Sequence, residues 1–123
     1  MNKINYFYTS NRGTIPDSTL LVTNNHMDAL NISTVSCFIL EGDPFRYSYE
    51  IDVNNFPSVR RSPLPPFETH NVMGQSIINM ISNFNFKDVY PNTQYIFEIR
   101  LFDNFGTQVD VATTTVFLVG EGK

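Results

Sequence analysis

Hydrophobic and polar residues alternate most regularly in two segments of the chain, residues 47–53 and residues 95–101. The hydrophobic positions are Tyr47, Tyr49, Ile51 and Val53 in the first segment and Tyr95, Phe97, Ile99 and Leu101 in the second. The residues between them are mostly polar or charged. A period of two is typical of a β-strand with one face on a core and the other in water. The pattern therefore predicts two strands of an antiparallel sheet.

Four further segments have weaker strand patterns. They are residues 4–9, 19–23, 33–40 and 109–119. The run 33–40 is apolar on both sides, which favours a central strand, and residues 24–28 before it resemble a loop. Asp103, Asn104, Phe105 and Gly106 form a turn signal, so residues 109–119 are predicted to return as the second strand of a hairpin.

Two segments between the predicted strands have less regular patterns. In residues 72–82, Met73, Ile77 and Met80 are spaced as on a helix, whereas the β-branched content favours a strand. A short helix near 73–82 and a strand therefore remain equal alternatives. Residues 54–70 carry four prolines and are interpreted as an irregular excursion within one domain.

Composition supports an all-β fold. Ile, Val, Thr, Tyr and Phe supply 48 of the 123 residues, whereas Ala, the best helix former, occurs twice. An all-helical domain is excluded on this basis. The length fits one domain, residues 1–123.

Charge and apolar runs exclude several classes of partner. The chain has 8 basic and 12 acidic residues, which argues against nucleic-acid and anionic-membrane binding. No apolar run approaches the length of a membrane span or of a signal peptide. With a single cysteine, Cys37, we expect a soluble cytoplasmic protein, although a mature form whose leader was removed would look the same.

Residues 84–119 resemble the end of a fibronectin type III or related immunoglobulin-like sandwich. The segment Val89-Tyr90-Pro91-Asn92-Thr93-Gln94-Tyr95 is similar to the corner before the penultimate strand, and the hairpin that follows also fits. The resemblance implies an immunoglobulin-like antiparallel β-sandwich and a Tyr95 hydroxyl bonded to upstream backbone. The chain lacks the tryptophan and the cysteine pair of such domains. It is also similar to small bacterial proteins of this fold, and its composition would suit a phage module.

Few residues carry the chemistry of catalysis or of metal binding. The histidines, His26 and His70, and Cys37 stand at no ligand-pair spacing, and no nucleotide-binding or hydrolase motif is present. The sequence therefore predicts no metal and no cofactor. Glu50, Asp52 and Glu98 share polar strand faces, where a solvated surface is favoured over a carboxylate-based hydrolase. We expect the protein not to be an enzyme.

The proline-rich segment is the best candidate for a partner-binding site. Residues 60–66 match the Arg-x-x-Pro-x-x-Pro pattern of polyproline ligands, and two phenylalanines lie beside the final hairpin turn. The predicted contact residues are Arg60, Arg61, Pro63, Pro66, Phe67, Phe102 and Phe105. The first hypothesis is therefore a non-enzymatic module that binds a protein partner, or itself, through these loops or a sheet edge.

A run of aromatic residues supports a second hypothesis. Tyr6, Phe7 and Tyr8 are consecutive, and exposed rings of this kind can stack on sugars or bases. The alternative function is therefore a carbohydrate- or small-ligand-binding module. It requires tyrosine or phenylalanine rings on an exposed face.

Overall fold

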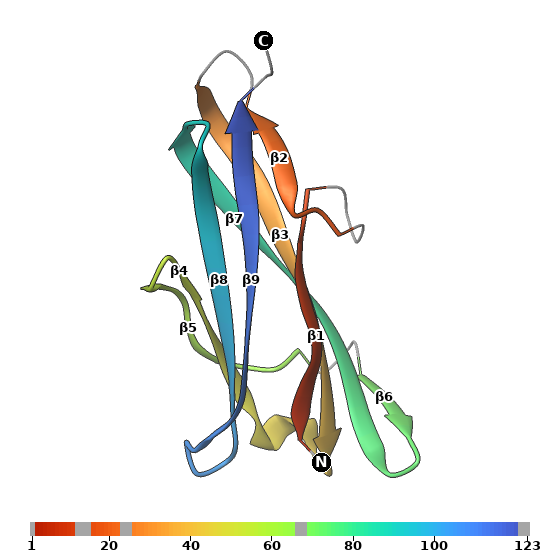
Figure 1. The fold of residues 1–123 in the computed structure, drawn as a ribbon. Helices are drawn as coiled ribbons and strands as arrows, with labels where there is room; N and C mark the ends of the chain where they lie inside the picture. The colour runs from red at the N-terminus through yellow and green to blue at the C-terminus, as the bar shows by residue number, and fades with distance from the viewer. Residues whose placement is uncertain (1, 12–15, 23–25, 66–68, 121–123) are drawn as a thin grey trace.

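The computed structural model describes residues 2–11, 16–22, 26–65 and 69–120, which form nine strands and one 3-10 turn (Figure 1). The elements are β1 (Lys3–Ser10), β2 (Thr19–Val22), β3 (Met27–Glu41), η2 (Pro44–Arg46), β4 (Ser48–Val53), β5 (Phe56–Pro63), β6 (Thr69–Val72), β7 (Gln75–Val89), β8 (Thr93–Phe102) and β9 (Gln108–Gly120). The described part of the chain holds no helix long and apolar enough to cross a bilayer.

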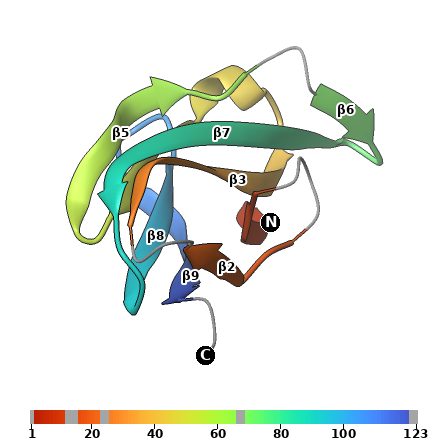
Figure 2. The same ribbon diagram turned by 90° about the horizontal axis from the view of Figure 1, so that it is seen from above.

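The strands form two sheets that pack face to face. One sheet has the order β1-β3-β7-β6 and the other β2-β9-β8-β4-β5. Seen from above, β3 and β7 lie on one side of the molecule and β8, β9 and β2 on the other (Figure 2). All pairs are antiparallel except β2 with β9. This strand order is that of an immunoglobulin-like sandwich, as the resemblance of residues 84–119 implies.

The core lies between the sheets, in two clusters along the sandwich. Phe38 and Ile78 from one sheet meet Ile51, Ile99 and Leu101 from the other in the first cluster. The second cluster is lined by Ile32, Val53, Phe97, Val116 and Leu118, among others. The strongly alternating strands β4 and β8 supply buried side chains to both clusters. Their period of two therefore identified the inner face of their sheet.

The segment 72–82 forms the end of β6, a turn and the first half of β7, so the helix alternative is wrong. Ser76, Ile78 and Met80 are buried, whereas Ile77 and Ile81 lie on the outer face. Apolar side chains cover both faces of β7 here, which gave the segment its helix-like spacing. The turn is made by Met73 and Gly74, both at positive φ.

The interpretation of residues 54–70 as irregular is also wrong. They include β5, which pairs with β4 at the sheet edge, and the start of β6. Pro57 and Pro63 lie within β5, and proline is tolerated in an edge strand because one side of the strand needs no donors. The predicted loop at 24–28 is too long, since β3 already begins at Met27.

The corner at residues 89–95 is present, but within the described residues the Tyr95 hydroxyl does not make the expected bond to upstream backbone. The segment connects β7 of one sheet to β8 of the other, and the Thr93 hydroxyl donates to the carbonyl of Tyr90 at 2.8 Å. The ring of Tyr95 instead stacks on Phe86 at 4.0 Å. Tyr47 connects the two sheets at the crossing from β3 to β4, because its hydroxyl donates to the carbonyl of Glu41 at 3.0 Å.

Candidate functional site

A cavity of about 590 Å³ wraps around the edge of β7 at residues 79–82. Tyr6 and Tyr8 of β1 and Val35 of β3 line it from the outer face of their sheet. Tyr49 of β4, with Pro63 and Pro65, lines it from the opposite sheet. The complete described lining is Tyr6, Tyr8, Val35, Tyr49, Pro63, Pro65, Asn79, Met80, Ile81 and Ser82. No residue in this lining carries a charge.

The tyrosines give the cavity both flat apolar surfaces and hydrogen-bonding groups. The rings of Tyr6 and Tyr8 lie 5.8 Å apart, and the Tyr6 hydroxyl donates to Asn79 Oδ1 at 2.9 Å. Burial raises the pKa of the Tyr6 and Tyr49 phenols above the ordinary value of 10.0, with smaller effects of Cys37 and Tyr8 at Tyr6. Both hydroxyls are therefore neutral donors near pH 7.

The three consecutive aromatic residues of β1 do not act together. A bulge between Ile4 and Tyr6 places Tyr6 and Tyr8 on the outer face, whereas Phe7 packs against the core. Tyr6 is 41% exposed and Tyr8 is half-buried. The exposed ring that the ligand-binding hypothesis requires is thus present, and it lines the cavity.

The predicted partner-binding residues lie in different environments. Arg60, Arg61 and Pro63 belong to β5, and Leu64 after them is buried in the core. Phe105 is 87% exposed at the tip of the final hairpin.

Phe102 is buried, and the Arg61 guanidinium lies 3.6 Å from the centre of its ring. Pro66 and Phe67 lie outside the described residues. Arg61 and Pro63 line one pocket together with Asp103 and Asn104 of the turn that follows Phe102.

The three candidate catalytic carboxylates gather around Arg100 on the outer face of β4 and β8. Arg100 pairs with Asp52 at 2.9 Å, with Glu50 at 3.4 Å and with Glu98. Hydrogen bonds, from Asp52 above all, raise the pKa of Arg100. Because each carboxylate is engaged by the same guanidinium, the arrangement is that of an ion-pair network between β4 and β8, which Arg61 of β5 joins through Glu50 at 3.6 Å.

Cys37 is buried in the middle of β3, and burial raises the pKa of its thiol. Such a thiol is poorly nucleophilic. His70 lies on β6, while His26 immediately precedes β3. The structure therefore does not bring these three residues together.

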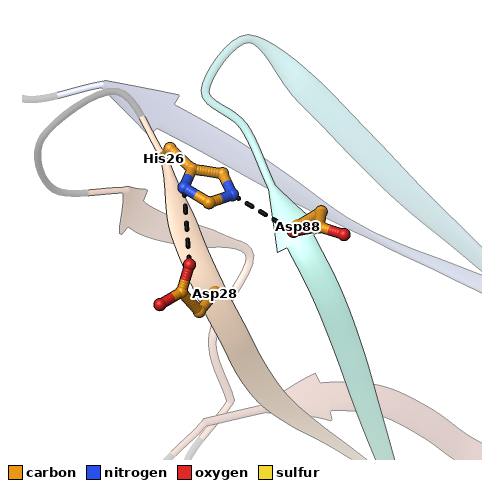
Figure 3. A group of neighbouring side chains, drawn as sticks. All are labelled: His26, Asp28 and Asp88. Atoms are coloured by element: carbon orange, nitrogen blue, oxygen red, sulfur yellow. Dashed lines mark hydrogen bonds and ion pairs between the residues drawn. The ribbon is translucent and has the colours of Figure 1, made fainter.

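One group of side chains was not found from the sequence. His26 lies between Asp28 and Asp88, at 3.6 Å from the first and 3.4 Å from the second (Figure 3). One ligand atom from each residue lies within 4.8 Å of the others. The spacing between histidines and cysteine does not reveal the His26-x-Asp28 pair, and Asp88 is remote from both in the sequence.

No family model matches the chain, and no curated protein matches it. Among solved structures, the chain is similar to the fibronectin(III)-like modules of Clostridium thermocellum CbhA. The identity is 11%, the alignment covers 99% of this chain and 100% of that chain, and the TM-score is 0.42. The strand order carries the fold assignment independently of this likeness.

Proposed function

We propose that the protein is a non-enzymatic binding module whose ligand is an uncharged molecule of saccharide size, held in the tyrosine-lined cavity. The observation that carries the proposal is the cavity itself. Its volume lies within the range of about 300–1,000 Å³ that ligand sites occupy. Its lining combines aromatic rings with a few hydroxyl and amide groups, a combination that suits a ligand with apolar faces and hydroxyl groups.

The described lining offers a specific way to hold such a ligand. The partly exposed ring of Tyr6 can stack on the apolar face of a sugar ring, and Tyr8 extends the same surface. Asn79 accepts from Tyr6 through Oδ1 and carries amide donors for a ligand hydroxyl. With no charge in the lining, an ionic ligand would lose hydration without gaining an opposite charge.

The ion pairs of Arg100 support a role without catalysis. A general acid or base needs a carboxyl group that can exchange a proton with a substrate. Glu50, Asp52 and Glu98 instead share one arginine. The buried Cys37 thiol offers no accessible nucleophile in its place.

The test is a screen of uncharged mono- and oligosaccharides against the full chain, followed by titration of the best binder with the Tyr6→Ala variant. We expect the variant to bind about tenfold more weakly, equivalent to about 1.4 kcal/mol. Loss of one aromatic stacking surface on a planar ligand is worth about 1–3 kcal/mol. Tyr6→Phe keeps the ring, so it should retain most of the affinity.

Tyr90→Ala is the matched control. Tyr90 is 53% exposed, similar to Tyr6, and does not line the cavity. Its loss should leave saccharide affinity unchanged. The proposal fails if no uncharged saccharide binds, or if Tyr90→Ala weakens binding as much as Tyr6→Ala.

A second candidate function is association with a protein, and a different surface favours it. Four large apolar side chains project from the outer face of β8 and β9, each between 37% and 48% exposed: Ile96, Val111, Phe117 and Val119. Exposed apolar patches of this kind are typical of interaction surfaces. In its simplest form this candidate is self-association through the β8–β9 face.

A further inference from the structure

The start of β3 and the end of β7 carry three metal-ligating side chains at the same end of one sheet. Met27 pairs with Val89 and Ala29 with Lys87, so Asp28 and Asp88 stand opposite each other between these pairs. His26 immediately precedes β3 and lies beside both carboxylates (Figure 3). The strand register thus holds together residues that are 60 positions apart in the sequence.

The three side chains lie near one another around the imidazole ring. His26 Nδ1 lies 3.6 Å from Asp28 Oδ1, and His26 Nε2 lies 3.4 Å from Asp88 Oδ1. One ion takes only one of the two ring nitrogens, so one carboxylate must rotate toward the nitrogen that the other carboxylate faces. One ligand atom of each residue already lies within 4.8 Å of the others, and both carboxylates are exposed, so such a rotation would bring all three onto one ion.

The charges at this point favour a cation. Two carboxylates directly opposite each other on antiparallel strands repel and destabilise the pair. In the part of the chain that the structure describes, both Asp28 and Asp88 have His26 as their ion-pair partner. One imidazole supplies at most a single positive charge and does not cancel two negative charges, whereas a divalent cation does.

The position of the imidazole is supported from a third side. The ring of Tyr90 packs on His26 with centroids 4.9 Å apart. His26 is also only partly exposed, whereas Asp28 and Asp88 are largely exposed and can adjust to an ion. One nitrogen ligand is therefore held in place, and two oxygen ligands are free to close on the ion.

We propose that His26, Asp28 and Asp88 form a Zn²⁺ site with one coordination position left for water or a ligand. The donor set favours zinc over Ca²⁺ and Mg²⁺ because it combines imidazole with carboxylates, whereas these two ions prefer oxygen ligands alone. The site is separate from the tyrosine-lined cavity, so a failure of one proposal would not contradict the other. A bound ion would join the first residues of β3 to the last residues of β7.

The experiment is a zinc titration of the untagged full chain in competition with a chromophoric chelator, near pH 7.5. We expect one zinc ion per chain and at least a tenfold loss of affinity in His26→Ala and in Asp88→Asn. A thermal scan with zinc should show a higher Tm for the unaltered chain, because an ion that binds only the folded state stabilises it. The Tm increase should be absent in His26→Ala.

His70→Ala is the matched control, because His70 is the second histidine and lies outside the group. It should bind zinc as the unaltered chain does. The proposal is overturned if zinc does not bind, or if His70→Ala loses as much affinity as His26→Ala. Retention of full zinc affinity by both His26→Ala and Asp88→Asn would also overturn it.

Discussion

This chain differs from the sandwiches that its corner resembles in which tyrosine hydroxyl bonds to the backbone. Tyr95 stands where the resemblance places a hydroxyl bonded to upstream backbone, yet it contributes a stacked ring. Tyr47, in contrast, is 9% exposed and its hydroxyl donates to the carbonyl of Glu41. Among the described residues, the tyrosine hydroxyl that pins a crossing between the sheets is therefore that of Tyr47, at the β3–β4 crossing.

This difference predicts the effect of removing each hydroxyl. Tyr47→Phe should lower the free energy of unfolding by about 1 kcal/mol, because the Glu41 carbonyl loses its donor. Tyr95→Phe should change it by less than about 0.5 kcal/mol, because the ring stacking on Phe86 is retained. Urea denaturation of both variants measures the two values. A larger loss in Tyr95→Phe than in Tyr47→Phe would contradict the assignment.

Residue patterns also explain which parts of the candidate site could be predicted. Tyr6 and Tyr8 are two positions apart and so share a strand face, which is visible in the sequence. Their encounter with Tyr49 and Pro63 depends on how the two sheets pack, and no local pattern encodes it. The His26 group could be predicted only once the β3–β7 register was known.

At the scale of elements, the sequence predicted the strands that have one face on the core and the other in water. β4 and β8 alternate regularly because their outer faces carry charged residues. β7 was ambiguous because apolar residues occupy both of its faces in the first half. β5 was hidden by its prolines, which an edge strand tolerates.

The strand assignment of β7 can be tested with two isoleucines three residues apart. On a helix, Ile78 and Ile81 would share a face, whereas on a strand they face opposite ways. Ile78 is fully buried and Ile81 is 51% exposed. Ile78→Ala should lower the free energy of unfolding by about 2–4 kcal/mol and Ile81→Ala by less than about 1 kcal/mol. Similar losses in chemical denaturation would contradict the strand.

At the scale of the whole molecule, the two sheets differ in what their outer faces present. The β1-β3-β7 sheet carries the tyrosine-lined cavity and, at one end, the His26 group. The β8–β9 face carries Ile96, Phe117 and Val119 toward one end, and Val111 beside Arg100 and its carboxylates toward the other. Ligand binding and self-association would therefore use opposite sides of the sandwich and could occur together.

Self-association through the β8–β9 face can be measured by the solution mass at increasing protein concentration. We expect the mass to rise toward that of a dimer. In Phe117→Ser, this rise should require about tenfold more protein, because a large apolar contact is lost. Phe105→Ser is a control at a phenylalanine outside this face that is even more exposed, 87% against 48% for Phe117. A monomeric mass at all concentrations would exclude this candidate.

The parallel pairing of β2 with β9 has a mechanical consequence. β2 is the second strand of the chain and β9 is the last. Because the two strands are parallel, tension between the two ends of the described chain pulls them in opposite directions along their length. The four paired positions, from Thr19 with Phe117 to Val22 with Gly120, would bear the load together. An antiparallel pair pulled from one end would open one bond at a time. Such tension would therefore load the β2–β9 contact in shear.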